Sequence, residues 1–254
     1  MSQPIVFIHG MFMNPLSWGN WTSFFAERGY SCHAPPWPYH DGAPSELRAD
    51  PDSRLGTLTL GEVVSTLRDF VGTLDGKPVL VGHSMGGLVV QKLMATGLGT
   101  AGVCIDSAPP KGVVSFEPSF LKANVPVINP LKGNRPCLLT VEEFHYAFCN
   151  TMTDEETRAA YDEFVVPESR NVARSSSGAD GAIDLRQPHA PLLFIAGEHD
   201  HIIPASLNRK NHAAYRDAES QCDFKEFEGR SHFICGQRGW QEVAEYVGGW
   251  LDAL

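Results

Sequence analysis

Short runs of apolar and β-branched residues alternate along the chain with amphipathic segments, and this alternation is the feature that most restricts the possible folds. Strands are predicted at residues 4–9, 30–34, 78–82, 102–106, 192–196 and 223–227. The first run is apolar throughout, as expected of a parallel strand covered on both faces. Strands that alternate with helices form βαβ units with right-handed crossovers. The sequence therefore predicts an α/β fold with a doubly wound, mostly parallel, six-stranded sheet.

The clearest predicted helix runs from Thr59 to Leu74. Its apolar residues recur at the three- and four-residue spacing of one buried helix face, at Leu60, Val63, Val64, Leu67, Phe70, Val71 and Leu74. Further helices are predicted at residues 15–28, 86–96 and 240–254. The first of these ends at Gly29, a residue type suited to the position after a helix C-terminus.

One segment interrupts the alternation between the fourth and fifth predicted strands. It contains about 80 residues, from Pro109 to Pro188, and a crossover needs far fewer. Two capping boxes lie within it, Thr140 with Glu143 and Thr153 with Glu156. We expect residues 111–188 to form an inserted helical cap over the carboxyl edge of the sheet, where ligands bind in open α/β sheets. Residues 1–110 and 189–254 then form the core.

The segment 79–87, V-L-V-G-H-S-M-G-G, places the motif G-x-S-x-G between a predicted strand and a predicted helix. A serine in this context stands on a strained turn that exposes its hydroxyl. Gly82 and Gly86 leave room for the turn, and the following helix directs its free amides to the site. Ser84 is therefore the predicted nucleophile, in preference to an incidental serine in a glycine-rich turn.

Two later segments supply the base and the acid that a serine nucleophile requires. G-R-S-H-F carries His232 just after the sixth strand, and L-L-F-I-A-G-E-H-D-H-I-I-P carries Asp200 just after the fifth. His232 is the predicted base and Asp200 the predicted orienting acid, with Glu198 and Asp106 as alternatives for the acid. Residues 198–201, E-H-D-H, are of types that can ligate a metal. However, no second motif with metal-ligand spacing occurs elsewhere in the sequence, so no metal and no cofactor are predicted.

The oxyanion of a tetrahedral intermediate needs two preorganised donors. The backbone N–H of Met85, the residue after the nucleophile, is one candidate. The loop H-G-M-F after the first strand offers the other, because Gly10 permits a tight turn that directs the N–H of Met11 to the site. An apolar residue suffices at position 11, since only its amide is used.

The charge balance excludes several classes of partner. The net charge is −10, from 20 basic and 30 acidic residues, which argues against nucleic acid and anionic membranes. No apolar run reaches the length of a membrane span, and the first residues lack the pattern of a signal peptide. The six cysteines form no C-x-x-C pair, and Cys104 and Cys222 lie in strand-like runs. Reduced thiols and a cytoplasmic location are expected.

With these motifs in place, the chain resembles the α/β-hydrolase superfamily of esterases, lipases and lactonases over nearly its whole length. The resemblance rests on H-G-M-F, G-H-S-M-G-G, G-E-H-D-H-I-I-P and G-R-S-H-F. It implies that the chain begins at what resembles the third strand of the family, hence six strands and not eight. Relatives with an aspartate nucleophile, such as epoxide hydrolases and dehalogenases, are disfavoured because Ser84 holds that position.

The substrate is expected to be a small molecule with an apolar group. Aromatic residues of the cap and of the flanking loops are candidates for a pocket that suits an apolar acyl or alcohol group, namely Phe12, Trp37, Phe144, Phe148 and Phe233. The first hypothesis is hydrolysis of small to medium apolar carboxylic esters. The second is a lactonase or C–C bond hydrolase with the same triad, and the third is a hydrolase-like ligand receptor with low turnover. The oligomeric state is left open.

Overall fold

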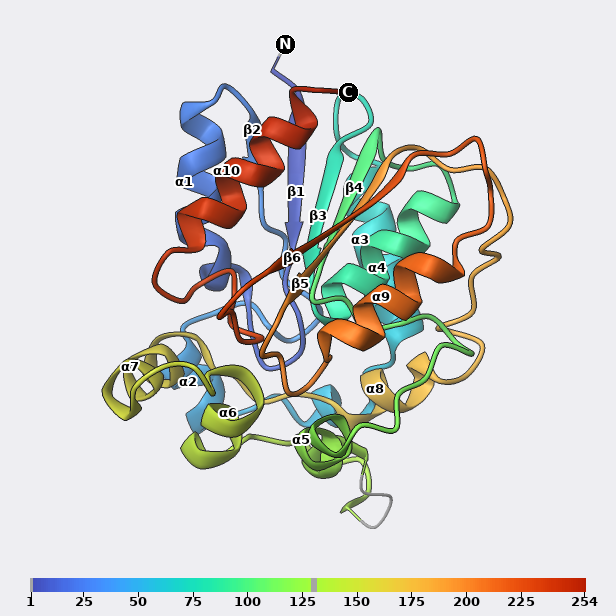
Figure 1. Cartoon of the computed structure of the whole chain (residues 1–254). Coiled ribbons are helices and arrows are strands. Elements are labelled where there is room, and N and C mark those ends of the chain that lie inside the picture. Colours follow the sequence, from blue (N-terminus) through green and yellow to red (C-terminus); the bar gives the residue numbers. More distant parts are fainter. Residues whose placement is uncertain (1, 129–131) are drawn as a thin grey trace.

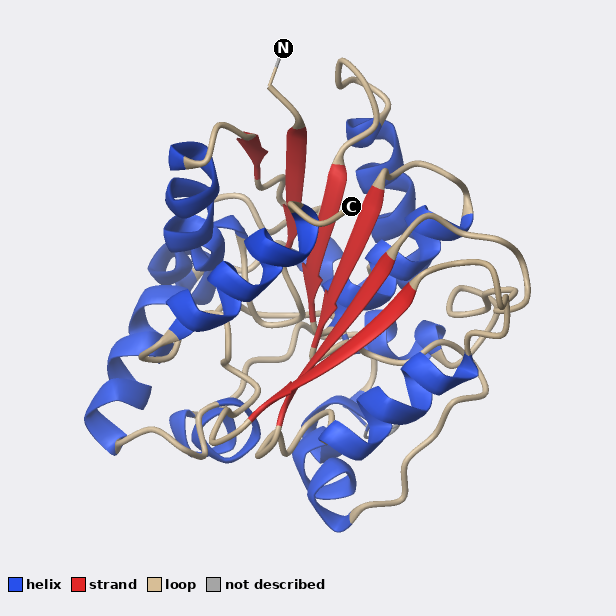
Figure 2. Cartoon of the chain, turned by 45° about the horizontal axis from the view of Figure 1, so that its top comes forward, coloured by secondary structure: helices blue, strands red, loops and turns tan. Residues whose placement is uncertain are grey.

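A computed structural model describes residues 2–128 and 132–254 and has a six-stranded sheet at its centre (Figures 1 and 2). The strands are β1 (Pro4–Ile8), β2 (Ser31–His33), β3 (Val79–His83), β4 (Ala101–Ile105), β5 (Leu192–Gly197) and β6 (Cys222–Phe227). All neighbouring strands run parallel, in the order β2-β1-β3-β4-β5-β6. The predicted six-stranded α/β sheet is thereby confirmed, and it is parallel throughout.

The central strands are buried on both faces because helices cover the sheet on each side (Figure 1). One face packs against α1 (Gly19–Glu27) and α10 (Trp240–Leu251), and the other against α3 (Leu60–Val71), α4 (Met85–Ala95) and α9 (Ala205–Ala214). These helices explain why β3, β4 and β5 consist of apolar and small residues without alternation, apart from His83 at the end of β3. The edge strand β6 is only half-buried and carries charged residues.

The carboxyl ends of the strands point to a second group of helices (Figure 1). Four of them come from the segment between β4 and β5: α5 (Pro118–Ile128), α6 (Val141–Phe148), α7 (Asp154–Phe164) and α8 (Arg170–Ser176). The small helix α2 (Pro44–Ala49) packs against α7. Both predicted capping boxes are present, with Thr140 and Thr153 as the N-caps of α6 and α7. Residues 129–131 of the predicted cap lie outside the described residues.

The predicted helices correspond to observed ones with small shifts in their ends. The segment predicted at 15–28 consists of a 3₁₀ turn, Pro15–Trp18, followed by α1, and Gly29 has the positive φ of 88° expected after a helix end. Another 3₁₀ turn, Ser53–Thr57, precedes α3. Cys104 is buried and Cys222 half-buried, and both thiols are free. None of the described helices is long and apolar enough to cross a membrane.

Candidate active site

Ser84 occupies a sharp turn between β3 and α4, at the carboxyl end of a central strand. Its backbone angles are φ 58° and ψ −123°, a conformation that costs a non-glycine residue about 1–3 kcal/mol. Two residues before and two residues after Ser84, only glycine fits. A Cβ on Gly82 would lie 2.3 Å from the Gly86 oxygen, and one on Gly86 would lie 2.2 Å from the Ile8 oxygen. The backbone therefore fixes the Ser84 side chain at the amino end of α4.

His232 and Asp200 are joined by a short hydrogen bond, 2.6 Å from His232 Nδ1 to Asp200 Oδ2, and both side chains are fully buried. The other oxygen of Asp200 accepts the amide N–H groups of Ile202 and Ile203, each at 2.8 Å. Burial lowers the pKa of His232, so the ring is neutral with its proton on Nδ1. Within the described residues its Nε2 atom has no hydrogen-bond partner, and it is therefore free to accept a proton.

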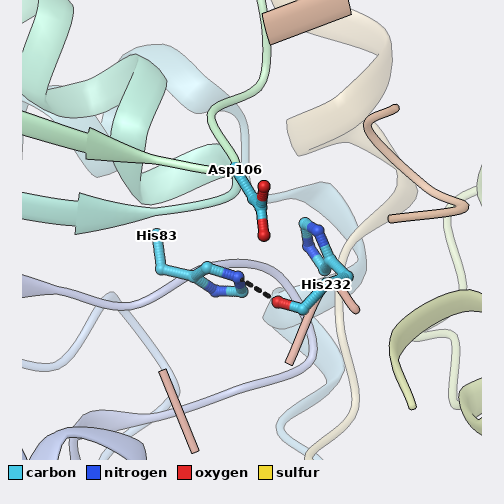
Figure 3. A group of neighbouring side chains, drawn as sticks. All are labelled: His83, Asp106 and His232. Carbon is cyan, nitrogen blue, oxygen red and sulfur yellow. Dashed lines mark hydrogen bonds between the residues drawn. The ribbon is translucent and has the colours of Figure 1, made fainter. Parts of the chain in front are cut away.

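His83, which directly precedes Ser84, holds the backbone of His232. Its Nε2–H donates to the His232 carbonyl oxygen at 2.7 Å, and the two rings lie 4.5 Å apart (Figure 3). Burial, and then the neighbouring His232, lower the pKa of His83, which keeps its ring neutral. The strand end that carries Ser84 is thus tied to the loop that carries His232.

Asp106 follows β4 with a positive φ of 42°, and its carboxyl group lies beside the His232 ring (Figure 3). One oxygen accepts the Gly197 amide N–H at 2.7 Å, whereas the other has no hydrogen-bond partner among the described residues. Burial, and then the charge of Asp200, raise the pKa of Asp106 well above its ordinary value. Burial also raises the pKa of Asp200, but the Ile203 and Ile202 amide N–H groups lower it, so Asp106 is the carboxyl group of the pair that holds a proton more readily.

His83, Asp106 and His232 each place one potential metal-ligand atom within 4.8 Å of the others. However, His83 already donates to the His232 carbonyl, and His232 already donates to Asp200. Both rings thus take part in hydrogen bonds between the strand ends, and we assign this cluster to the hydrogen-bond network of the site.

The loop after β1 approaches Ser84 closely. A Cβ on Gly10 would lie 2.7 Å from the Cβ of Ser84 and 2.9 Å from the His83 oxygen, so only glycine permits this approach. In the described part of the chain, neither the Met11 nor the Met85 amide donates a hydrogen bond to another protein group. Both residues line the same cavity as Ser84.

That cavity has a volume of about 410 Å³ and reaches from Ser84 to the helices of the β4–β5 segment. Its wall is mainly apolar, formed among others by Met11, Phe12, Met85, Val113, Phe116, Phe120, Val127, Phe148, Ile202 and Ile203. Polar groups are fewer, and they include Lys111, Asn124, Ser176 and Ser177. Val114, Phe116 and Leu121 are also exposed, so the apolar wall continues to the surface.

The sequence profile of the Alpha/beta hydrolase family matches residues 5–246, which is nearly the whole chain. This chain belongs to the alpha/beta hydrolase family. A sequence comparison with curated proteins found no match to this chain.

Several solved structures share this hydrolase fold over their full length. A pyrethroid hydrolase from Sphingobium faniae JZ-2 is 18% identical with a TM-score of 0.70, covering 100% of this chain and 98% of that one. A methylesterase from Arabidopsis is 14% identical with a TM-score of 0.73, covering 99% and 100%. Polyneuridine aldehyde esterase is 17% identical with a TM-score of 0.68, covering 96% and 97%. At these identities the likeness extends to the fold alone.

The structure of this hydrolase-family chain divides the five aromatic pocket candidates. Phe12 and Phe148 line the cavity, and the Phe148 ring lies edge-on to His232 at 4.7 Å. Phe144 stacks behind Phe148 at 5.0 Å and also contacts Phe233, and neither of these two lines the cavity. Trp37 does not line the cavity either. Its ring packs against the His9 ring, with 4.6 Å between the ring centres.

The expectation that Phe144 and Phe148 both face the pocket therefore holds for Phe148 alone. Residues 144 and 148 share one helix face, but α6 is short, and only its last turn reaches the cavity. His145, which lies between them in the sequence, does not line the cavity, and its Nε2 atom lies 3.1 Å from the Met152 carbonyl oxygen. The alternative acid Glu198 lies at the surface, where it accepts the Gly229 amide N–H.

Four buried polar residues near the site, His9, His40, His83 and Glu168, were not singled out from the sequence. His83 occupies a variable position within the G-x-S-x-G motif, so the motif itself carries no signal for it. His40 and Glu168 contact each other across 128 residues of chain, and no local pattern marks such a pair. Only His9 offered a signal, as the residue before Gly10 in H-G-M-F.

Proposed function

We propose that this protein is a serine hydrolase that cleaves carboxylic esters with small to medium apolar groups through an acyl-enzyme intermediate. The observation that carries the proposal is the arrangement around Ser84. A serine on a strained turn lies at the wall of an apolar cavity, beside the loop that holds a neutral histidine bonded to a buried carboxylate. A serine hydroxyl needs such a base, and the base needs such a partner.

In the proposed mechanism, Ser84 Oγ attacks the ester carbonyl carbon while its proton moves to His232 Nε2. The carbonyl electron pair moves onto oxygen and forms the tetrahedral oxyanion. When this intermediate collapses, the bond to the alcohol oxygen breaks, and His232 returns the proton to the leaving alcohol. A water molecule then repeats the sequence on the acyl-enzyme and releases the acid. Asp200 stabilises the imidazolium through the 2.6 Å bond to Nδ1.

The oxyanion is proposed to bind the amide N–H groups of Met11 and Met85. Support comes from the close approach of Gly10 to Ser84 and from the two amides, which donate to no other group among the described residues. Met85 is the first residue of α4, so the positive end of the helix dipole adds to its effect. Two preorganised donors of this kind contribute a large share of the rate in acyl transfer.

The substrate class follows from the cavity. Its volume of about 410 Å³ and its apolar wall suit an acyl or alcohol group of medium size. The similar folds include proteins described as a methylesterase and as polyneuridine aldehyde esterase, whose names both refer to ester chemistry. A lactone is an ester closed into a ring and is accepted by the same mechanism, so a lactone series belongs in the substrate screen.

The test is Ser84→Ala together with a fluorophosphonate label and a series of p-nitrophenyl esters. We expect rapid labelling of the wild type at Ser84, repeated turnover, and a loss of about 10⁴-fold or more in kcat/KM in the variant. The melting temperature should change little, because the hydroxyl contributes chemistry and not packing. Residual activity within about tenfold of wild type would contradict the assignment of Ser84. Slow labelling with a single turnover would favour a ligand receptor.

A further inference from the structure

Three buried polar side chains lie behind the loop that follows β1. His9 belongs to this loop, His40 to the chain between β2 and α2, and Glu168 to the chain between α7 and α8. Glu168 and His40 are 0% exposed and His9 is 1% exposed. None of the three touches the cavity or the reacting atoms, so the mechanism above leaves their presence unexplained.

Hydrogen-bond partners fix the charge of His40. Its Nδ1 atom lies 2.9 Å from the Pro38 carbonyl oxygen, and its Nε2 atom lies 3.2 Å from Glu168 Oε2. Both partners are acceptors, so both ring nitrogens carry a proton and His40 is an imidazolium paired with a carboxylate. Burial alone lowers the pKa of His40, but the charge and hydrogen bond of Glu168 and the Pro38 carbonyl outweigh it and raise the pKa.

Glu168 is surrounded by donors. Oε1 accepts the Ser169 amide N–H at 2.6 Å, while Oε2 accepts both His40 and the Phe12 amide N–H, the latter at 3.3 Å. A neutral amide side chain would turn an N–H group toward one of these donors, so only a carboxylate satisfies all of them. The backbone of Glu168 is itself fixed by two hydrogen bonds to Cys137, of 2.8 and 2.7 Å.

The bond to Phe12 holds a strained part of the loop. Phe12 has a positive φ of 64°, which costs a residue with a side chain about 1–3 kcal/mol. Its amide N–H is held by Glu168, and its carbonyl oxygen accepts the Val166 amide N–H at 3.0 Å. Both peptide groups of Phe12 are thus bound by one short segment of the β4–β5 region, Val166 to Glu168.

The preceding peptide group is held by His9. Nε2 of His9 accepts the Trp37 amide N–H at 3.2 Å, so the proton resides on Nδ1, which donates to the Gly10 carbonyl oxygen at 2.9 Å. The Gly10 carbonyl and the Met11 N–H belong to one planar trans peptide and point in opposite directions. A bond that fixes the carbonyl therefore fixes the direction of the Met11 N–H.

We propose that the buried Glu168–His40 ion pair positions the loop after β1, residues 9–12, so that the Met11 N–H is preorganised toward the oxyanion of the tetrahedral intermediate. Glu168 is a positioning residue, acting through Phe12 on one side of Met11 while His9 acts through Gly10 on the other. The inference rests on the proposed serine hydrolase function. It gives Glu168 a positioning role in addition to the contribution of the β4–β5 segment to the wall of the cavity.

The decisive variant is Glu168→Gln, which keeps the shape and removes the charge. We expect kcat to fall about ten- to a hundredfold, less than the loss of about 10²–10³-fold that follows deletion of one oxyanion donor. KM should stay within about threefold, because the ground-state ester does not use the oxyanion hole fully. A medium-chain trifluoromethyl ketone, which forms a tetrahedral adduct with Ser84, should bind more weakly in the same proportion as kcat. The carboxamide of equal chain length should bind unchanged.

The matched control is Glu143→Gln, since Glu143 is another carboxylate that accepts a backbone N–H in the same region but is bonded to Thr140. It should lower the melting temperature slightly and leave kcat and the ketone affinity unchanged. Should Glu168→Gln fail to fold, His40→Asn takes its place, because asparagine retains a donor near the Pro38 oxygen but does not reach Glu168. It should show the same selective loss of kcat and ketone affinity.

Amide hydrogen exchange gives a readout that does not depend on activity. Exchange in residues 9–12 should be faster in Glu168→Gln than in wild type and unchanged in Glu143→Gln. A folded Glu168→Gln with wild-type kcat, ketone affinity and loop exchange would overturn the inference while leaving the proposed function intact. A wild-type protein without ester turnover and without labelling of Ser84 would instead contradict the proposed function itself.

Discussion

At the scale of single residues, the protonation states around Ser84 follow from which neighbouring atoms donate and which accept. His83 and His232 are neutral, His40 is charged, and Asp106 retains a proton beside the ionised Asp200. Each of these side chains is fully or nearly fully buried, so no water is available to compensate an incorrect state. Substitutions that imitate either the protonated or the ionised form of one of these side chains are therefore sensitive probes of the site.

Asp200→Asn and Asp106→Asn are expected to differ strongly in their effect on activity. Asparagine at 200 can donate to His232 Nδ1, which favours the tautomer with the proton on Nε2. That tautomer cannot accept the Ser84 proton, so kcat should fall about 10³–10⁴-fold. Asparagine at 106 resembles the protonated acid, because its oxygen can still accept the Gly197 N–H and its amide group carries no charge. Activity should then remain within about tenfold of wild type. Steady-state kinetics on one p-nitrophenyl ester compares both, and a larger loss for Asp106→Asn would place the orienting acid after β4.

At the scale of elements, α6 presents its two phenylalanines to different surroundings. Phe148 lines the cavity and contacts the His232 ring, whereas Phe144 packs against Tyr161 and Phe233. Both are almost fully buried, so truncation of either removes a similar amount of packing. Only one of the two truncations should alter the space available to a substrate.

Phe148→Ala should shift the preference toward longer acyl chains, because it enlarges the cavity next to Ser84. For an acetate ester, kcat/KM should stay within about tenfold of wild type, since a small acyl group makes little use of the lost surface. Phe144→Ala is the control: it should cost stability in the range of about 3–5 kcal/mol known for such truncations, without a change in preference. Ratios of kcat/KM across acyl lengths measure the effect, and a parallel fall at every length would assign Phe148 to packing.

Sequence patterns predicted the strands and long helices but missed several short elements. The six strands, the capping boxes of α6 and α7, and helices α3, α4 and α10 carry local periodicity or capping signals, and the structure confirms them. Helix α9 was missed because its polar sequence follows Pro204 without a clear apolar stripe. Helices α2 and α8 have six and seven residues, too few to show a period.

The residues of the candidate site also fall into two groups, those that sequence patterns predicted and those that they did not. Ser84, Asp200 and His232 could be named as candidates from the sequence because each follows a strand of one parallel sheet, and parallel strands bring their carboxyl ends together. The pair of His40 and Glu168 could not, because its contact depends on how the chain between β4 and β5 folds back on the core. The same holds for Phe144 and Phe148, whose distinct roles follow from tertiary packing and not from helix spacing.

At the scale of the whole molecule, the buried histidines determine how stability responds to acid. The pKa values of His9, His83 and His232 are lowered, so the unfolded chain takes up protons below about pH 6.5 that the folded chain does not. Each contributes a fall in the free energy of unfolding of about 1.4 kcal/mol per pH unit as the pH decreases further. Asp106 opposes this trend, because its raised pKa keeps a proton in the folded state.

We therefore expect urea unfolding to give a lower free energy of unfolding at pH 5 than at pH 6.5. His83→Gln is the informative variant, since its amide can still donate to the His232 carbonyl but no longer titrates. Its acid dependence should be shallower by about 1.4 kcal/mol per pH unit. His40 has the opposite sign: its raised pKa gives a stabilisation that is complete below about pH 6.5 and is lost as the pH rises through the folded pKa. An unfolding free energy that rises on acidification would contradict this scheme.

The parallel arrangement of all six strands also separates the two ends of the described chain from the cavity. Every strand begins at one pole of the molecule, and both termini lie there, whereas α5, α6 and α8 lie at the other pole (Figure 1). A carrier protein, an affinity tag or an immobilisation linker attached at either end would consequently extend from the pole opposite the entrance to Ser84. Attachment to a solid support in this orientation leaves the route for substrate and product open.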